Sequence, residues 1–347
     1  MERLVHRLYG LDSRAEPLAA ERDQNCLVHA VSGERYVLKV SNPSEPVPIV
    51  DFQIAALDHI AGIAPSLPVP RVVRTLAGRA REAVRLPDSS RCTLRMLTYV
   101  DGLQARETGG SAAQRRAMAR YLAELDTALA GFTHPAAMHD LLWNVATAHR
   151  LRDKLEFIAN PDRRGIAALF MDRFTTHVLP RLPTLRAQVI HNDYHLYNVL
   201  VAPDDPACVC GIIDFGDMVS APLVGEVATA ASYHMESKEN PFAGASQFIG
   251  AYHFDDRSKS ASIQSALSLE SAPSFQTVRS SNMVKETRSP VLIRQRAATG
   301  GTERRRPKAS RQRAARPPGS RCPGRGRNRG PNIPPPTPGR RPGEPAI

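Results

Sequence analysis

One stretch, residues 191–217, constrains this chain more than any other. It begins His-Asn-Asp-Tyr-His-Leu-Tyr-Asn and ends Gly-Ile-Ile-Asp-Phe-Gly-Asp. Asp193 precedes Asn198 by five residues, and Asp214 follows an apolar run just before Phe-Gly. Phosphoryl transfer from a nucleotide needs such a set, namely a carboxylate that takes the acceptor's proton and two oxygen ligands for Mg²⁺. The stretch therefore predicts the active site of a kinase.

The spacing inside this stretch predicts a β-hairpin. Asn198 opens the apolar run 199–201, a turn containing Pro and Asp follows, and the run 209–213 leads into Asp214. Such a hairpin places Asn198 at the start of one strand and Asp214 at the end of the other. The alternative is a surface hairpin whose acids are merely solvated. The order of the residues favours the functional interpretation.

Upstream, residues 35–40 form an apolar strand with Lys39 inside it. A lysine in a hydrophobic strand is costly unless it finds an anionic partner, and in a kinase that partner is the nucleotide's phosphates. The alternative is a lysine on the solvated face of an edge strand. Residues 21–25 could form the turn over the phosphates, but they lack the glycine-rich pattern of protein kinases.

Apolar residues at helical spacing predict a helix over residues 51–61. This helix should carry the side chain that steadies Lys39. The expected glutamate is missing, and we choose Gln53 over Asp51, although an amide can orient an ammonium without neutralising it.

Two further strands are predicted over residues 71–76 and 93–100. The second ends in Asp-Gly, which fits a hinge between two lobes. Backbone groups around Thr98 and Val100 are therefore candidates for hydrogen bonds to a purine base. A plain strand and turn is the alternative for these residues taken alone.

The chain resembles the aminoglycoside phosphotransferase / choline kinase superfamily, and within it the hydroxylysine kinase-like branch. The resemblance covers about residues 15–253. The stretches that carry it are Glu21-Arg22-Asp23-Gln24-Asn25, Tyr36-Val37-Leu38-Lys39, Asp51-Phe52-Gln53, Val69-Pro70-Arg71-Val72-Val73, Leu97-Thr98-Tyr99, Val189-Ile190-His191-Asn192-Asp193, Asn198-Val199-Leu200-Val201 and Gly211-Ile212-Ile213-Asp214-Phe215-Gly216-Asp217.

This resemblance implies an α+β, bilobal protein-kinase-like fold, with a small β-rich N-lobe and a mostly helical C-lobe. It implies Asp193 as catalytic base, with His191 bracing the loop, and Asn198 and Asp214 as Mg²⁺ ligands. Lys39 would hold the phosphates of ATP or GTP, and the acceptor would be a small amino alcohol. For His191 a hydrogen-bonded structural role is favoured over proton transfer.

Three other side chains near the motif have open roles. His195 follows Asp193 by two residues, and an exposed loop histidine is the simpler interpretation. Asp217 could orient an acceptor ammonium or cap the helix that follows. Trp143, the only tryptophan, is expected to be a core or cleft-wall aromatic residue.

The charge is concentrated at one end of the chain. Residues 254–347 hold 20 basic and 6 acidic side chains, a net of +14, whereas the remaining 26 basic and 28 acidic side chains give −2. This Ser-rich and then Arg/Pro-rich segment cannot bury enough apolar surface to fold, so we expect a disordered tail. A nucleic-acid-binding arm or a membrane tether are possible functions, but aromatic residues for base stacking are lacking. A frame change in a GC-rich coding sequence explains the composition better.

We therefore expect a nucleotide-binding N-lobe over residues 1–98, an incomplete catalytic C-lobe over residues 99–253, and the tail. The predicted function is transfer of the γ-phosphoryl of ATP or GTP to a small amino alcohol, with 5-hydroxylysine as the first candidate. The alternatives are an inactive truncated pseudokinase and nucleic-acid binding through the tail. No apolar run of membrane-spanning length and no apolar signal core occur in the sequence, so we expect a cytoplasmic protein with no membrane or nucleic-acid partner.

Overall fold

The computed structural model describes residues 1–20, 22–86, 89–235 and 239–256, with side chains up to residue 253. The expected disordered tail and the frame-change hypothesis concern residues 254–347. Apart from the backbone of the last helical turn, they lie outside the described residues. Among the described helices, none combines the length and the apolar character that a bilayer crossing requires.

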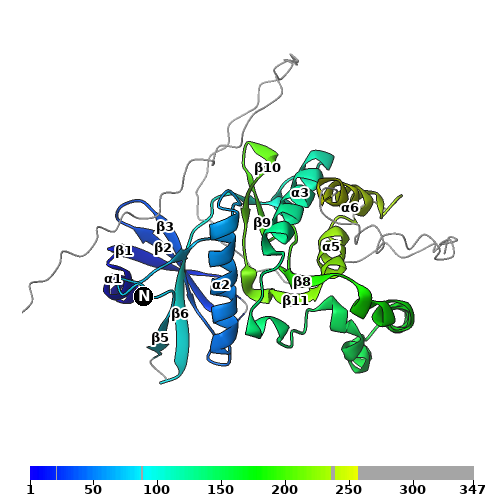
Figure 1. The fold of residues 1–347 in the computed structure, drawn as a ribbon, viewed down its shortest axis with the longest axis horizontal. Coiled ribbons are helices and arrows are strands. Elements are labelled where there is room, and N and C mark those ends of the chain that lie inside the picture. The colour runs from blue at the N-terminus through cyan, green and yellow to red at the C-terminus, as the bar shows by residue number, and fades with distance from the viewer. Residues whose placement is uncertain (21, 87–88, 236–238, 257–347) are drawn as a thin grey trace, which may run out of the picture. The chain divides into compact units, whose positions relative to one another are not determined.

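The N-terminal region is built on a six-stranded antiparallel sheet (Figure 1). Its strand order is β1-β2-β3-β6-β4, and β5 also pairs with β6. Buried and less buried positions alternate along β3, which shows that one face of the sheet packs on a core. The strands are β1 Ser13–Leu18, β2 Gln24–Ala30, β3 Arg35–Val40, β4 Val72–Val73, β5 Glu82–Arg85 and β6 Arg91–Thr98.

Two helices accompany this sheet. Helix α1 (Glu2–Tyr9) contributes Val5 to a core formed with β2, β3 and β6. Helix α2 (Val47–Ile63) begins after Pro46 and contains the whole helix predicted over residues 51–61, which confirms that prediction. Its buried side chains include Phe52 and Ile60, which belong to a second core shared with the helical region.

The second region is mostly helical. Helices α3 (Ala112–Leu129) and α5 (Leu223–Ser232) both pack against α6 (Ala243–Asp256) (Figure 1). Ser111 caps the N-terminus of α3, where its hydroxyl accepts the backbone N–H of Gln114. The long apolar face of α3 supplies much of the core that supports the site. A β-rich region followed by a mostly helical one is the predicted α+β architecture.

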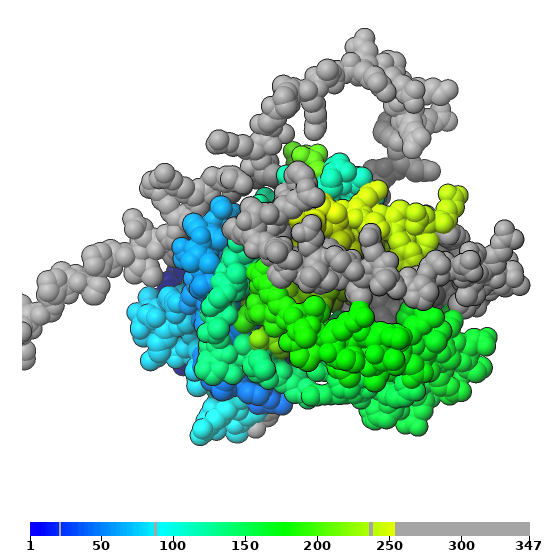
Figure 2. All heavy atoms as spheres, turned by 45° about the vertical axis from the view of Figure 1, so that its right-hand side comes forward, coloured from blue at the N-terminus to red at the C-terminus, as the bar shows by residue number. Residues whose placement is uncertain are grey.

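Residues 145–184 form a succession of short helical elements on the surface (green in Figure 2). These are η3 (Val145–Phe157), α4 (Pro161–Arg173), η4 (Phe174–Val178) and η5 (Leu179–Thr184), and none of them has a buried residue. A turn of 3₁₀ helix, η2 (Pro135–Met138), precedes them.

The predicted hairpin is present. Strand β9 (Val199–Ala202) pairs antiparallel with β10 (Asp205–Ile212), whose register is interrupted by bulges, and β7 (Leu103–Gln104) extends this sheet. Strand β8 (Ala187–Ile190) pairs with β11 (Val219–Pro222), so the segments on both sides of the loop 191–198 are held in sheets. Two 3₁₀ turns, η1 (Ala105–Glu107) and η6 (Phe215–Asp217), complete the region.

Tyr194 fixes the loop 191–198 to helix α3. Its side chain is fully buried, and its hydroxyl donates to the carbonyl of Met118 at 2.8 Å. Burial of such a ring contributes roughly 1.5–3 kcal/mol, and the hydrogen bond adds about 1 kcal/mol. The loop that carries the chemical groups is therefore anchored in the core.

One strand prediction was too long. Only Val72 and Val73 of the expected strand 71–76 pair with β6. The chain then turns, because Thr75 accepts the N–H of Gly78 and its own N–H donates to the carbonyl of Arg79. The boundary predicted at residue 98 falls at the end of β6 and stays a prediction.

Candidate active site

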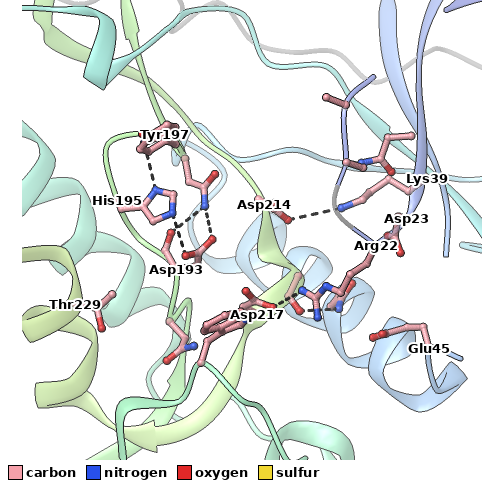
Figure 3. Close-up of a pocket in the computed structure, with 18 of the residues that line it drawn as sticks. Arg22, Asp23, Lys39, Glu45, Asp193, His195, Tyr197, Asp214, Asp217 and Thr229 are labelled. Carbon is pink, nitrogen blue, oxygen red and sulfur yellow. Dashed lines mark hydrogen bonds and ion pairs between the residues drawn. The ribbon is translucent and has the colours of Figure 1, made fainter. Parts of the chain in front are cut away.

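A cavity of about 730 Å³ lies where the sheet region meets the loop 191–198 and the hairpin. Figure 3 shows Lys39 and Asp214 facing each other, with Asp193 beyond Asp214. Lys39 comes from β3, Asp193 and Asn198 come from the loop before β9, and Asp214 follows β10. The structure thus brings four of the predicted site residues to one cavity, and Gln53 of α2 lines it as well.

Both oxygens of the Asp193 carboxylate have a partner. Asn198 Nδ2 donates to Oδ2 at 2.6 Å and also to the Asp193 carbonyl at 3.0 Å. His195 Nε2 lies 3.1 Å from Oδ1 (Figure 3). These contacts fix the plane of the carboxylate inside the cavity. The contact with His195 is one that sequence reasoning missed, although the spacing of two residues was a usable signal.

His191 supports the loop 191–198 from the interior of the protein. It is completely buried, its Nε2 lies 3.1 Å from the carbonyl of Ile213, and its Nδ1 accepts the N–H of Asp193. Burial lowers the pKa of this imidazole, so the ring is neutral at pH 7 and suits these two contacts. The ring ties the catalytic loop to the strand before Asp214, and it is not among the residues that line the cavity.

A buried carboxyl group supports the same loop from the other side. Glu226 of α5 has no exposed surface, and its Oε2 accepts the backbone N–H of Asn192 at 2.6 Å. Asn192 adopts a left-handed conformation, with φ of 65°, that needs such support. Burial raises the pKa of Glu226 to about 7. No sequence signal pointed to Glu226 in this role, because it lies 34 residues after Asn192.

Lys39 and Asp214 form an ion pair across the cavity. The Lys39 Nζ lies 3.7 Å from Asp214 Oδ1, and the lysine side chain is only 14% exposed. Burial opposes ionisation of Asp214, but the charge of Lys39, a hydrogen bond from the Gly216 backbone and the charge of Arg22 outweigh it and lower the carboxyl pKa. Asp214 is therefore an anion at neutral pH, which is the form that a metal ligand needs.

The donor set fits Mg²⁺. Asn198 donates its Nδ2 hydrogens to Asp193, so its amide oxygen remains as a ligand for a cation, and Asp214 supplies a carboxylate. No cluster of three or more His, Cys, Asp or Glu side chains within the described part of the chain could hold a metal by itself. A site with one carboxylate and one amide suits Mg²⁺, which takes its remaining ligands from water and phosphates.

Gln53 contacts other groups than we expected. Its Oε1 accepts from Arg95 Nη2 at 2.5 Å, and its Nε2 donates to the carbonyl of Gly216 at 3.1 Å. The amide is therefore committed to these partners rather than to the ammonium of Lys39. Arg95 was not expected in the site, yet it lies directly opposite Lys39 in the register of β3 and β6 and lines the cavity.

The two hinge candidates do not line the cavity. The N–H of Thr98 donates to the carbonyl of Arg71, and its hydroxyl accepts the N–H of Arg71, so both groups are occupied within the sheet region. Val100 packs beside Gly211 on the hairpin, where an added Cβ at Gly211 would lie 2.7 Å from it. Base recognition by Thr98 and Val100 stays a prediction.

Asp217 lines the cavity and pairs with Arg22 at 2.5 Å (Figure 3), and it does not cap helix α5, whose N-cap is Pro222. Arg22 belongs to the turn that we expected over the phosphates; Glu21, in the same turn, lies outside the described residues. This pair links the sheet region to the segment after Asp214.

Aromatic side chains form the wall beyond Asp193. Trp143 is 60% exposed and lines the cavity, which agrees with the expected cleft-wall position. Tyr197 and Tyr233 line it too, and the ring of His195 lies 4.7 Å from that of Tyr233. The guanidinium carbon of Arg106 lies 4.2 Å from the centre of the Tyr197 ring and covers one of its faces.

The chain is similar in sequence to curated proteins named hydroxylysine kinase. Hydroxylysine kinase of Danio rerio is 28% identical over 252 residues, which cover 69% of this chain and 70% of the relative. Hydroxylysine kinase of Mus musculus is 28% identical over 272 residues, which cover 72% of each chain.

Solved structures share the fold. An amicoumacin kinase in complex with AMP-PNP, Ca²⁺ and Ami superposes with a TM-score of 0.57 at 14% identity, covering 74% of this chain and 76% of that one. A microcompartment-associated aminopropanol kinase gives a TM-score of 0.51 at 17% identity, covering 73% and 79%. The predicted kinase-like fold is therefore confirmed. The model of the phosphotransferase enzyme family matches residues 14–260, and the chain belongs to that family.

Proposed function

We propose that this phosphotransferase moves the γ-phosphoryl of ATP or GTP to the hydroxyl of a small amino alcohol, with 5-hydroxylysine or a similar amine as the first candidate. The observation that carries the proposal is the convergence of Lys39, Asp193 and Asp214 on one cavity. The curated relatives named hydroxylysine kinase support the choice of acceptor.

In this proposal each side chain has one task. The Asp193 carboxylate accepts the proton of the acceptor hydroxyl while the hydroxyl oxygen bonds to the γ-phosphorus, and the bond from that phosphorus to the β–γ bridging oxygen breaks. ADP or GDP leaves with the bridging oxygen. Asn198 and Asp214 would hold Mg²⁺, which supplies neutralisation of phosphate charge when it is bound. Lys39 holds phosphate oxygens.

The held carboxylate of Asp193 is suited to its task. Hydrogen bonds from Asn198 and His195 orient it before an acceptor arrives, so little reorganisation is needed during the reaction. His195 contacts Oδ1 and Asn198 contacts Oδ2, so the two side chains together fix the orientation of the carboxylate.

The acceptor end of the cavity favours an amine. Trp143 and Tyr233 line the same cavity as Asp193, and the faces of aromatic rings attract cations by about 0.5–2 kcal/mol. Burial and the charge of Asp193 raise the pKa of Tyr233, so its phenol remains neutral and keeps its apolar face. In an acceptor whose ammonium lies a short chain away from its hydroxyl, the hydroxyl would reach Asp193 while the ammonium contacts an aromatic ring.

An acceptor panel tests the proposal. The full-length protein is incubated with Mg²⁺ and ATP or GTP and with 5-hydroxylysine, choline, homoserine, an aminoglycoside or, as a compound without an amine, glycerol. Mass spectrometry detects the phosphorylated product, and Asp193→Asn provides the background. We expect amino alcohols to be phosphorylated and glycerol to stay at background. No product from any acceptor, with nucleotide binding intact, would instead support the pseudokinase alternative.

A further inference from the structure

Gln53 connects three parts of the site through hydrogen bonds. It belongs to helix α2 and is 5% exposed. One end of its amide accepts from Arg95 on β6, and the other end donates to the carbonyl of Gly216, two residues after Asp214. A chain of hydrogen bonds thus runs from the sheet through the helix to the segment that carries a predicted metal ligand.

The middle of this chain needs a side chain that both accepts and donates, and the Gln53 amide does both. A guanidinium can only donate hydrogen bonds, and a backbone carbonyl can only accept them. The side chain between Arg95 and Gly216 must therefore offer one acceptor and one donor, which fixes the orientation of the Gln53 amide as well. An ionised glutamate would satisfy Arg95 and place an oxygen against the oxygen of Gly216.

Arg95 is an unusual residue to find at this position. It is 4% exposed and sits directly across the β3–β6 ladder from Lys39. Its Nη1 has no hydrogen-bond partner among the described residues, so the bond to Gln53 is the one that holds the guanidinium. Burial lowers the pKa of Arg95, yet arginine keeps its charge in proteins. The relay therefore begins at a rigidly enclosed cation.

The segment that the relay reaches needs support. Asp214 has φ of 61°, a left-handed conformation that few side chains adopt without help from their surroundings. Phe215 is buried against the ring of His191, with 4.8 Å between the ring centres, which holds one side of the turn. The bond from Gln53 to Gly216 holds the other side.

We propose that Arg95 and Gln53 are positioning residues that hold the Gly216 carbonyl and thereby keep the Asp214 carboxylate turned toward the metal and Lys39. The relay engages the side chain of helix α2 that was expected to face Lys39, and within the described part of the chain Lys39 pairs with Asp214. This inference rests on the proposed function because it assigns the relay to the metal-binding conformation of that same site.

Two substitutions at Gln53 separate the parts of the relay. Gln53→Glu keeps the acceptor for Arg95 and removes only the donor to Gly216, whereas Gln53→Met removes both at similar volume. Gln114→Glu is the matched control, because Gln114 is equally buried and donates to the carbonyl of Ala105, away from the cavity. All three are made in the full-length chain.

The first measurement is ATP binding by calorimetry with and without Mg²⁺, which needs no acceptor and no turnover. Substitution of a residue that hydrogen-bonds to a metal ligand typically lowers the metal affinity by about 10–100-fold. Mg²⁺ should raise the affinity of wild type for ATP, and we expect this increase to be at least about tenfold smaller in both Gln53 variants. Without metal, the ATP affinity of both variants should stay within about twofold of wild type, because Lys39 is intact. Gln114→Glu should keep the full gain.

The second measurement is hydrogen exchange of the peptide covering residues 211–218 in the ligand-free protein. We expect faster exchange in both Gln53 variants and wild-type exchange in Gln114→Glu. Wild-type Mg²⁺ dependence and exchange in Gln53→Glu would overturn the relay, as would an equal loss in Gln114→Glu. If wild-type protein shows no Mg²⁺ effect on ATP, the proposed function fails, and the exchange data still decide whether the relay holds this segment.

Discussion

Replacing Glu226 by glutamine should change how the stability of this protein depends on pH. The carboxyl group is fully buried beneath the catalytic loop, and burial raises its pKa from the ordinary 4.5 to about 7. Because the folded pKa lies above the unfolded one, the native state keeps an extra proton between about pH 4.5 and pH 7. Stability from this group is present below that window and is lost as the pH rises through it.

The size of the effect follows from the two pKa values. Each pKa unit corresponds to about 1.4 kcal/mol, so ionising Glu226 destabilises the native state by about 3 kcal/mol at high pH. Between pH 5 and pH 8 the change is about 2–3 kcal/mol, since part of the window lies below pH 5. For a protein of this size, this corresponds to a decrease of roughly 5–10 °C in Tm.

Thermal unfolding of wild type, Glu226→Gln and Glu124→Gln at pH 5, 6, 7 and 8 tests this reasoning. Glutamine keeps an oxygen for the N–H of Asn192 and cannot ionise, whereas Glu124 is exposed on α3 and serves as control. We expect the Tm of Glu226→Gln minus that of wild type to increase steadily from pH 5 to pH 8. The Tm of Glu124→Gln should follow that of wild type at every pH. Parallel curves for wild type and Glu226→Gln would refute the assignment of a raised pKa to this carboxyl.

Three further substitutions probe the cavity. Lys39→Met should weaken ATP binding by about 10–100-fold in calorimetry, because a charged hydrogen bond to phosphate is lost; unchanged affinity would contradict a phosphate role. His195→Ala should lower kcat about five- to tenfold with ATP affinity intact, since one partner of the Asp193 carboxylate is removed. Trp143→Ala should raise the KM of the amine acceptor about fivefold and leave the KM of ATP unchanged, because an aromatic side chain that lines the cavity is lost; an equal change in both constants would indicate general disruption.

Local patterns predicted the parts of the site that lie close together in the sequence. Asp193, Asn198 and Asp214 share one hairpin, so residue order alone was enough to place them near one another. Lys39 was identifiable because it interrupts an apolar strand. In both cases a polar or charged side chain lies within or beside an apolar run, and the sequence alone shows this.

Contacts between distant segments were beyond the reach of sequence reasoning. Gln53 was expected to face Lys39, but the register of β3 and β6 places Arg95 within its reach, and register depends on the whole sheet. Glu226 meets Asn192 only because α5 folds back beneath the loop. Thr98 was a candidate for base binding, and its hydrogen bonds to Arg71 depend on the pairing of β4 with β6.

The central claim is that the Asp193 carboxylate takes the proton of an acceptor hydroxyl while phosphates and metal are held by Lys39, Asn198 and Asp214. The most direct measurement is phosphorylation of 5-hydroxylysine by wild type and Asp193→Asn with saturating ATP and Mg²⁺, followed by mass spectrometry, alongside ATP affinity by calorimetry. We predict that kcat falls by about 10²–10⁴-fold while ATP affinity stays within about threefold. Phosphorylation by Asp193→Asn at the wild-type rate would contradict the claim.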